Sequence, residues 1–219
     1  MAGHSSVLSR KTLAGLRVAR QLVAHPSAFG TVGSLLTGDT RWDHGEPWWN
    51  ARAISYLGEQ LRPGSVAFEW GSGGSTVFLA GLGVTVTSIE HDPEWVAHVL
   101  ERCPGADVRL VPGETSGQLR SEPVLRDRGQ HFFDAYVAAI DQVAAESLDL
   151  VIVDGLCRIE CVRRAQPKVR PGGLLVVDDT DLRFLAGLDR ELPGWPAVSL
   201  TGFKRPFDVR QTSFFRKPG

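Results

Sequence analysis

Cysteine is scarce in this chain of 219 residues, and its three cysteines are odd in number. They are too few for a disulfide framework and form no Cys-x-x-Cys motif, so neither a disulfide-rich domain nor a zinc site is expected. Membrane-spanning runs are also missing, because Arg, Asp, Gly or Pro interrupts every apolar segment before the ~20 residues that a bilayer requires. These absences predict a cytoplasmic protein that is not integral to a membrane.

An excess of either charge is missing too. Lys and Arg total 24 and Asp and Glu total 25, which leaves a net charge of -1. This balance provides no bulk field for a polyanion or an anionic membrane, so we expect neither as a partner. A hydrophobic content of 42% with 22% charged residues is typical of a globular protein. The length predicts one domain with an appended arm.

Acidic residues are absent from residues 1–38, which carry four basic side chains: Arg10, Lys11, Arg17 and Arg20. Apolar residues recur at helical spacing over residues 5–25, which predicts an amphipathic helix. We assign residues 1–46 to an N-terminal helical arm and connector, and residues 47–219 to the main domain. The arm is expected to pack on the domain or to form a homodimer; a membrane-surface helix and a transit peptide are alternatives.

Beyond Pro63, β-branched apolar runs alternate with helical segments, which predicts a parallel sheet covered on both faces. Strands are expected at 65–70, 85–91, 107–111, 148–154 and 173–178. Helices are expected through residue 61 and at 75–82, 93–102, 136–145, 158–169 and 181–191. Two further strand-like runs, 197–203 and 211–215, predict an antiparallel hairpin at the sheet edge. The expected fold is α/β, Rossmann-like and doubly wound, with a mostly parallel sheet.

Ligands of open α/β sheets bind at the carboxyl ends of the strands. The first predicted strand runs into residues 69–76 (Glu-Trp-Gly-Ser-Gly-Gly-Ser-Thr), where glycines permit a tight turn and close approach to a ligand at a helix N-terminus. The second strand closes with Glu90, which could accept hydrogen bonds from a ribose diol. Together these segments predict an adenosine-type cofactor.

Two other nucleotide sites match this loop poorly. A dinucleotide fingerprint would need a third glycine where Thr76 stands, and a Walker loop would need a lysine after the glycines. The pattern Glu69-x-Gly71-x-Gly73 with Glu90 closing the next strand instead resembles motif I and the acidic motif of class I S-adenosylmethionine-dependent methyltransferases. Ser75 stands where motif I often has its third glycine, and a small serine there can cap the following helix.

The resemblance covers the chain from Pro47 to its C-terminus. Residues 148–155 are similar to the fourth strand of that family, and residues 169–179 to its turn and fifth strand. The glycine loop, residues 88–95 and residues 153–158 together resemble a small-molecule, sugar-type O-methyltransferase branch. The cofactor-binding residues that the resemblance implies are Glu69, Gly71, Ser72, Gly73, Ser75, Glu90, His91, Glu114 and Asp154.

Each implied contact has a chemical reason. Glu69 would engage the methionine ammonium, directly or through water, and Glu90 would hold the ribose hydroxyls. Glu114 belongs to the segment after the third strand, which would border the adenine. His91 is a candidate for contact with the adenine ring, with a surface histidine beside a helix as the alternative.

Carboxylates at adjacent strand ends are candidates for activating the acceptor. A hydroxyl that attacks a sulfonium methyl group must be positioned in line and lose its proton. Asp154, Asp178 and Asp179 would converge, and their oxygens suit Mg²⁺, as in the metal-dependent sugar O-methyltransferases that this arrangement resembles. In one alternative, Asp154 or Asp179 acts directly as the base. In the other, strand alternation separates Asp178 from Asp179, and Asp179 or Thr180 only caps the helix that starts near Asp181.

Other side chains bear on the acceptor. Trp48 and Trp49 could stack on a sugar ring, although anchoring the arm is an alternative, and Tyr136 either contacts the ligand or packs in the core. Arg158 could bind a substrate oxyanion or pair with a carboxylate. We expect methyl transfer to a hydroxyl of a small molecule, a sugar or a glycosylated metabolite. N- or carboxyl-methylation and a non-catalytic cofactor-binding subunit are the alternatives.

Overall fold

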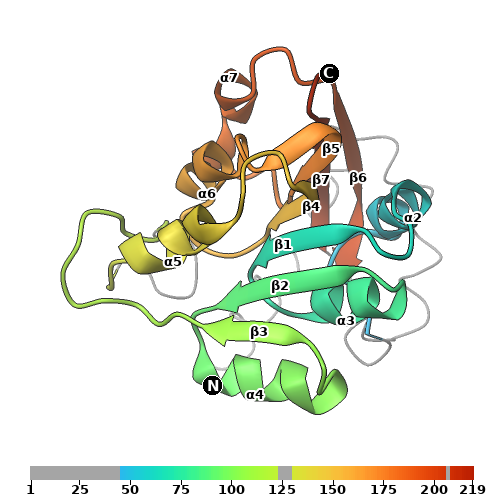
Figure 1. Cartoon of the computed structure of the whole chain (residues 1–219). Coiled ribbons are helices and arrows are strands. Elements are labelled where there is room, and N and C mark those ends of the chain that lie inside the picture. The colour runs from blue at the N-terminus through green and yellow to red at the C-terminus, as the bar shows by residue number, and fades with distance from the viewer. Residues whose placement is uncertain (1–44, 123–129, 206–207) are drawn as a thin grey trace, which may run out of the picture.

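The computed structural model describes residues 45–122, 130–205 and 208–219, which build a seven-stranded sheet in the order β3-β2-β1-β4-β5-β7-β6 (Figure 1). Five strands are parallel: β1 (Val66–Trp70), β2 (Thr85–Glu90), β3 (Asp107–Leu110), β4 (Leu148–Val153) and β5 (Val169–Val177). The hairpin of β6 (Ala197–Arg205) and β7 (Asp208–Arg216) joins antiparallel to β5. The predicted α/β fold and its C-terminal hairpin are confirmed.

The strand register aligns the carboxyl ends of the central strands. Trp70 of β1 lies opposite Ile89 of β2 and Val153 of β4, and Val153 in turn lies opposite Val177 of β5. The residues that follow these strands therefore meet at one edge of the sheet. The strand order reverses between β1 and β4, and such a switch point is where open α/β sheets bind ligands.

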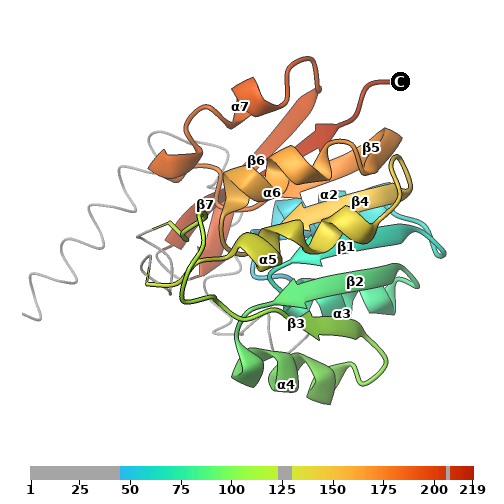
Figure 2. The ribbon, with the colours of Figure 1, turned by 60° about the vertical axis from the view of Figure 1, so that its left-hand side comes forward.

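Helices cover both faces of the sheet. The described helices are α2 (Ala51–Gln60), α3 (Gly74–Gly81), α4 (Pro93–Arg102), α5 (Asp134–Ala138), α6 (Arg158–Ala165) and α7 (Leu188–Glu191), with the 3-10 turns η3 (Ala139–Gln142) and η4 (Arg183–Leu185). Figure 2 shows α5 and α6 in front of the sheet, with α2 and α3 behind it.

The alternation of side chains along β4 explains why both faces are buried. Val151 and Val153 belong to the core cluster under α5 and α6, whereas Leu150 and Ile152 belong to the cluster under α2 and α3. All four side chains are fully buried. Successive strand residues point to opposite faces, so a central strand between two helical layers reads as one continuous apolar run.

Three predicted helices differ from the structure. The helix expected at 136–145 begins earlier and is completed by η3, and the one expected at 158–169 ends at Ala165 because β5 already begins at Val169. The helix expected at 181–191 is wrong. It is divided into η4 and α7, and Gly187 between them has a φ of 107°, a backbone conformation that a helix does not contain.

The predicted amphipathic helix at residues 5–25 lies outside the described residues. The division of the chain at residue 46 and the arm-mediated dimer therefore stay predictions. Among the helices of the described segments, none is long and apolar enough to cross a membrane.

Candidate functional site

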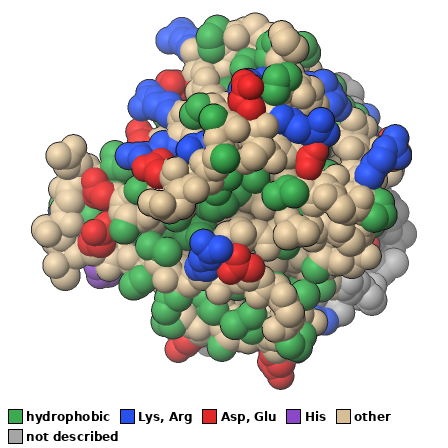
Figure 3. Space-filling view, in the orientation of Figure 1, with side chains coloured by type: hydrophobic (Ala, Val, Ile, Leu, Met, Phe, Trp, Pro, Cys, Tyr) green, Lys and Arg blue, Asp and Glu red, His purple; other side chains and the backbone are tan. Residues whose placement is uncertain are grey.

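A pocket of about 430 Å³ opens at the switch point, where the carboxyl ends of β1, β2, β4 and β5 meet. Its wall combines the glycine loop after β1 with Glu90 of β2 and with acidic and basic side chains beyond β4 and β5. On the face shown in Figure 3, basic and acidic side chains are interspersed. The pocket thus brings together the two motifs that the sequence singled out, the glycine loop and the acidic strand ends.

The glycine loop packs tightly against the loop after β4. Gly71 has a φ of 91°, and a Cβ atom at this position would lie 2.8 Å from the backbone nitrogen of Gly155. A Cβ atom at Gly74 would lie 1.9 Å from the carbonyl oxygen of Glu46. Only glycine fits at these two positions, so the loop gains its close approach to the neighbouring backbone from the lack of side chains.

Glu69 lies beneath this loop and not on the pocket wall. Its carboxylate is fully buried and accepts hydrogen bonds from the hydroxyls of Ser75, Thr76 (2.6 Å) and Ser88 (2.8 Å). Burial raises the pKa of Glu69 to about 7, although the three hydroxyls lower it. Ser75 lines the pocket and binds Glu69 in place of the predicted helix cap. The geometry therefore connects Glu69 to the pocket through Ser75.

Glu90 lies on the pocket wall and is held by backbone amides. Its Oε1 accepts hydrogen bonds from the amides of His91 (2.7 Å) and Asp92 (3.0 Å), and its Oε2 accepts one from Ser72 (3.1 Å). These bonds give the carboxylate one orientation at the end of β2. His91 also lines the pocket, with its Nδ1 at 2.7 Å from Glu90 Oε1.

Of the aromatic side chains that the sequence singled out, one lines the pocket and two are buried. Trp48 lines the pocket together with Trp95, at 5.8 Å between ring centroids, and Trp95 Nε1 donates to the carbonyl of Ser72 (2.5 Å). Trp49 is fully buried, and its Nε1 donates to Asp154 Oδ2 (3.0 Å). Tyr136, a residue of α5, is fully buried in the core. Trp95 was not predicted, because its place beside the loop depends on the packing of α4.

Glu114 is also placed away from the pocket wall. Its Oε2 accepts a hydrogen bond from the amide of Ala135 (3.0 Å) in the first turn of α5. Its backbone pairs with Phe132 in an isolated antiparallel bridge. Glu114 therefore accepts a hydrogen bond from the first turn of α5, and its contact with an adenine ring stays a prediction.

Three carboxylates converge beyond β4 and β5. Asp154, Asp178 and Asp179 each offer an oxygen atom, and these atoms lie within 4.8 Å of one another. The alternative in which strand alternation separates Asp178 from Asp179 is therefore wrong. β5 ends at Val177, and Asp179 adopts a left-handed backbone with a φ of 52°, so its side chain no longer follows the alternation of the strand.

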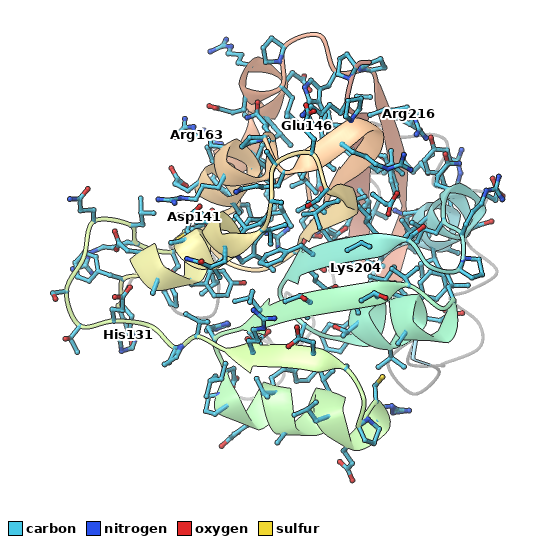
Figure 4. The ribbon with its side chains drawn as sticks, in the orientation of Figure 1. His131, Asp141, Glu146, Arg163, Lys204 and Arg216 are labelled. Carbon is cyan, nitrogen blue, oxygen red and sulfur yellow. The ribbon has the colours of Figure 1, made fainter. Side chains whose placement is uncertain are left out.

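Three cations lie against this acidic cluster: Lys204, Arg158 and Arg210, whose Nε is 3.6 Å from Asp179 Oδ1. Lys204 Nζ lies 2.6 Å from Asp178 Oδ2 and 3.1 Å from Asp179 Oδ1. The Arg158 guanidinium lies 3.1 Å from Asp154 Oδ1 and 3.8 Å from Asp179 Oδ2. In the view of Figure 4, Lys204 lies near the middle of the molecule, whereas Arg163 and Arg216 lie toward its edges. Lys204 was missed by sequence reasoning, which assigned its segment only to a hairpin connection.

Arg158 connects the ends of β4 and β5. It is 4% exposed and donates to the carbonyls of Gly155 (2.9 Å) and Asp178 (2.5 Å) as well as to Asp154. Its own backbone amide, at the start of α6, donates to Glu122 (2.9 Å). Of the two roles weighed for Arg158, the structure contains the pairing with a carboxylate.

The protonation states of this cluster follow from its contacts. Burial alone would raise the pKa of Asp179, but Lys204 and Arg158 outweigh that effect and lower it below the ordinary value. For Lys204, burial lowers the pKa, and the charges of Asp178, Asp154 and Asp179 outweigh it, so the pKa is raised. At neutral pH the pocket wall therefore presents an ionised Asp179 beside a protonated Lys204.

The fold is that of a doubly wound α/β protein, with a pocket at the switch point of its sheet. Residues 68–180 match the family model described as a methyltransferase domain, and the chain belongs to this family. It is an S-adenosylmethionine-dependent methyltransferase with the class I fold. The matched segment contains the glycine loop, Glu90 and all three carboxylates.

The chain is similar to solved structures at low sequence identity. An rRNA methylase from Streptococcus thermophilus is 15% identical and superposes with a TM-score of 0.53, covering 77% of this chain and 95% of that chain. A precorrin-8w decarboxylase from Methanobacterium thermoautotrophicum is 20% identical, with a TM-score of 0.49 and coverages of 77% and 89%. An S-adenosylmethionine-dependent methyltransferase from Geobacter sulfurreducens, in complex with S-adenosyl-L-homocysteine, is 13% identical, with a TM-score of 0.49 and coverages of 80% and 93%. No curated protein sequence matches this chain.

Proposed function

We propose that this enzyme methylates a hydroxyl group of a small molecule, with a sugar or a glycosylated metabolite as the acceptor. One observation carries the proposal: a single pocket wall joins the glycine loop and Glu90 to Asp154, Asp179 and Lys204. The cofactor half of that wall fits an adenosine-containing methyl donor. The acidic half supplies a base next to the place where the methyl group would be presented.

The cofactor half offers complementary chemistry. Glu90 provides a carboxylate of fixed orientation for the ribose hydroxyls, and the backbone of Gly71, Ser72 and Gly73 provides a close approach for the methionine portion. When bound, S-adenosylmethionine supplies an electrophilic methyl group on a sulfonium. Glu69 would act on the methionine ammonium through Ser75, because its carboxylate does not reach the wall.

The acceptor oxygen needs a base and a fixed position. We assign the base to Asp179, which lines the pocket and is held ionised by its cationic neighbours. Asp154 is the other candidate; Arg158 and Trp49 donate to its two oxygens, as Lys204 does to those of Asp179. In the transfer, the hydroxyl proton moves to Asp179 as the oxygen bonds to the methyl carbon. The electron pair of the broken C–S bond stays on sulfur, which becomes an uncharged thioether.

The acceptor class rests on the pocket wall. Trp48 and Trp95 present aromatic surface, on which sugar rings commonly stack, next to charged groups that can bind hydroxyls. An amine acceptor, the runner-up, would be protonated near neutral pH and would lie beside the ammonium of Lys204. These contacts favour an uncharged hydroxyl.

The Mg²⁺ ion implied by the family resemblance does not fit this set of side chains. The three carboxylates lie close enough to share an ion, but Lys204 and Arg158 are already bound to their oxygens. A divalent cation here would lie beside an ammonium group that is 2.6 Å from one of its ligands. We therefore assign no step of the reaction to a metal.

A methyl-transfer assay tests this proposal. Purified enzyme with radiolabelled S-adenosylmethionine would be screened against monosaccharides, glycosides, phenols and amines, with binding of S-adenosyl-L-homocysteine measured by calorimetry as a control for an intact cofactor site. We expect label to enter hydroxylated acceptors. Label entering amines, with hydroxyl compounds inert, would overturn the assignment.

A further inference from the structure

We propose that Lys204 takes the place of a divalent cation in this site: its ammonium group binds the acceptor oxygen, and the enzyme transfers methyl groups without metal. The inference rests on the proposed hydroxyl acceptor. It concerns a side chain that none of the sequence motifs contains, on the hairpin at the far end of the chain.

Lys204 is built into the site by buried partners. Its side chain is 11% exposed and lines the pocket, whereas Asp178 behind it is fully buried and does not line the pocket. Asp178 Oδ1 accepts a hydrogen bond from Thr212 Oγ1 (2.6 Å), which directs Oδ2 to Lys204. Asp178 thus anchors the ammonium and has no direct access to a ligand.

The ammonium group retains a donor for a ligand. Nζ has three hydrogens: one is directed to Asp178, and a second is shared between the two oxygens of Asp179, at 3.1 and 3.2 Å. The third is available on the side of the pocket that Lys204 lines. An acceptor oxygen bound there would contact Lys204 and Asp179 together, which places a positive charge and a base on one hydroxyl.

The same contacts leave a metal ion little to bind. The oxygens of Asp154 accept from Arg158 (3.1 Å) and Trp49 (3.0 Å), those of Asp178 accept from Thr212 and Lys204, and those of Asp179 accept from Lys204. Entry of a dication would break these hydrogen bonds and bring it next to two buried cations. Burial makes that repulsion much stronger than in water.

Lys204 would act as an electrostatic catalyst and not as a base. Its neighbours keep it protonated, so it cannot accept the hydroxyl proton, which goes to Asp179. As that proton leaves, negative charge grows on the acceptor oxygen, and a fixed ammonium in a site of low dielectric stabilises it. A metal ion would supply the same effect as a Lewis acid. In this enzyme the positive charge would belong to a side chain and not to a bound metal ion.

Metal binding by the unmodified protein is the first test, and it needs no acceptor. Full-length protein treated with a chelator would be titrated with Mn²⁺ and followed by calorimetry and by electron paramagnetic resonance. We expect no binding at the acidic cluster below millimolar Mn²⁺. Submillimolar binding that Asp178→Asn abolishes would overturn the inference, as would a tenfold loss of activity on chelation that Mg²⁺ restores.

Substitution of Lys204 is the second test. Lys204→Met keeps much of the aliphatic side chain and removes the charge, so we expect kcat to fall about 100-fold with unchanged affinity for S-adenosyl-L-homocysteine. We also expect this variant to gain Mn²⁺ binding, because its carboxylates have lost a cation. Unchanged kcat without Mn²⁺ binding would contradict the assignment. If the variant does not fold, the Mn²⁺ titration of the unmodified protein still tests whether the site excludes a metal.

A matched control separates this effect from the general loss of a lysine. Lys217 is also mostly buried and binds Glu146 (3.0 Å) and the carbonyl of Val169 (2.9 Å), at the start of β5 and away from the pocket. We expect Lys217→Met to change neither kcat nor metal binding.

The failure of the proposed function can be distinguished from the failure of this inference. If S-adenosyl-L-homocysteine binds but hydroxyl compounds are not methylated, the proposed function fails, and so does acceptor binding by Lys204. The Mn²⁺ titration still decides separately whether Lys204 excludes a metal.

Discussion

At the scale of single residues, two left-handed positions lie in the loops that follow β4 and β5. Asp179 has a φ of 52° and Cys157 a φ of 50°, conformations that cost a non-glycine residue about 1–3 kcal/mol. The left-handed backbone at Asp179 brings its carboxylate to Lys204, and that at Cys157 precedes the first turn of α6. Strand periodicity could predict that acidic residues end these strands, but not that the backbone would turn here.

Asp179→Asn should abolish most of the activity while leaving the cofactor site intact. An amide cannot accept the acceptor proton, so we expect kcat to fall by about 10²–10⁴. Because its neighbours lower the pKa of Asp179, the acid limb of the kcat profile of unmodified enzyme should lie below the ordinary aspartate range. Asp189→Asn on the surface of α7 is the control. Full activity of Asp179→Asn would move the base to Asp154.

Glu69 should make stability depend on pH. Its pKa is about 7 in the folded protein and near 4.5 when unfolded, so the folded state binds the proton more tightly. The contribution is present below pH 4.5 and is lost as the pH rises to about 7, by up to about 3 kcal/mol. Urea unfolding across this range should show a flatter profile for Glu69→Gln. Identical profiles for both proteins would contradict the raised pKa.

At the scale of elements, the pattern of apolar runs was a good guide to the strands and a poorer one to short helices. Each of the five parallel strands was placed with its carboxyl end within a residue of the structure, because a buried strand is a continuous apolar run that ends abruptly in polar loop residues. The helix expected at 181–191 failed at Gly187, and no periodicity reveals which glycine will adopt a positive φ.

Gly71→Ala should disturb the site more than Gly64→Ala, although alanine has a similar backbone strain at both positions. Its Cβ would lie 2.8 Å from Gly155 N, whereas Gly64, with a similar φ of 84°, has no atom within 4 Å of its Cβ position. We expect both variants to lose about 1 kcal/mol of stability from strain, and Gly71→Ala alone to lose a further 1–3 kcal/mol from overpacking and to bind S-adenosyl-L-homocysteine at least tenfold more weakly. Chemical denaturation and calorimetry measure both. Equal behaviour of the two variants would show that the close approach is unimportant.

At the scale of the whole molecule, the C-terminal hairpin completes the site. β7 pairs with β5 and carries Thr212 to Asp178, and β6 carries Lys204 to the acidic cluster. The acidic half of the pocket therefore combines strand ends from the middle of the chain with a side chain more than 20 residues later. The near-zero net charge conceals this local arrangement of compensated charges.

The N-terminal arm should determine the oligomeric state. Residues 1–38 carry basic side chains and no acidic ones, and we predict that they pair two subunits. Protein lacking these residues should elute as a monomer in size-exclusion chromatography with light scattering, whereas the full chain should elute as a dimer. Equal mass per particle for the two proteins would exclude this role.

The sequence by itself determined the class of the fold and the cofactor, because both depend on local patterns: apolar periodicity, a glycine loop and a carboxylate at the next strand end. It also predicted that three aspartates converge, since parallel strands end at one edge. Only the tertiary structure decided what neutralises them. Lys204 contacts the cluster because β6 pairs with β7 in the C-terminal hairpin. Trp49, which precedes β1 in the sequence, donates a hydrogen bond to Asp154. Local sequence patterns do not reveal contacts between residues so far apart, so the sequence predicted the three carboxylates but not the cations that pair with them.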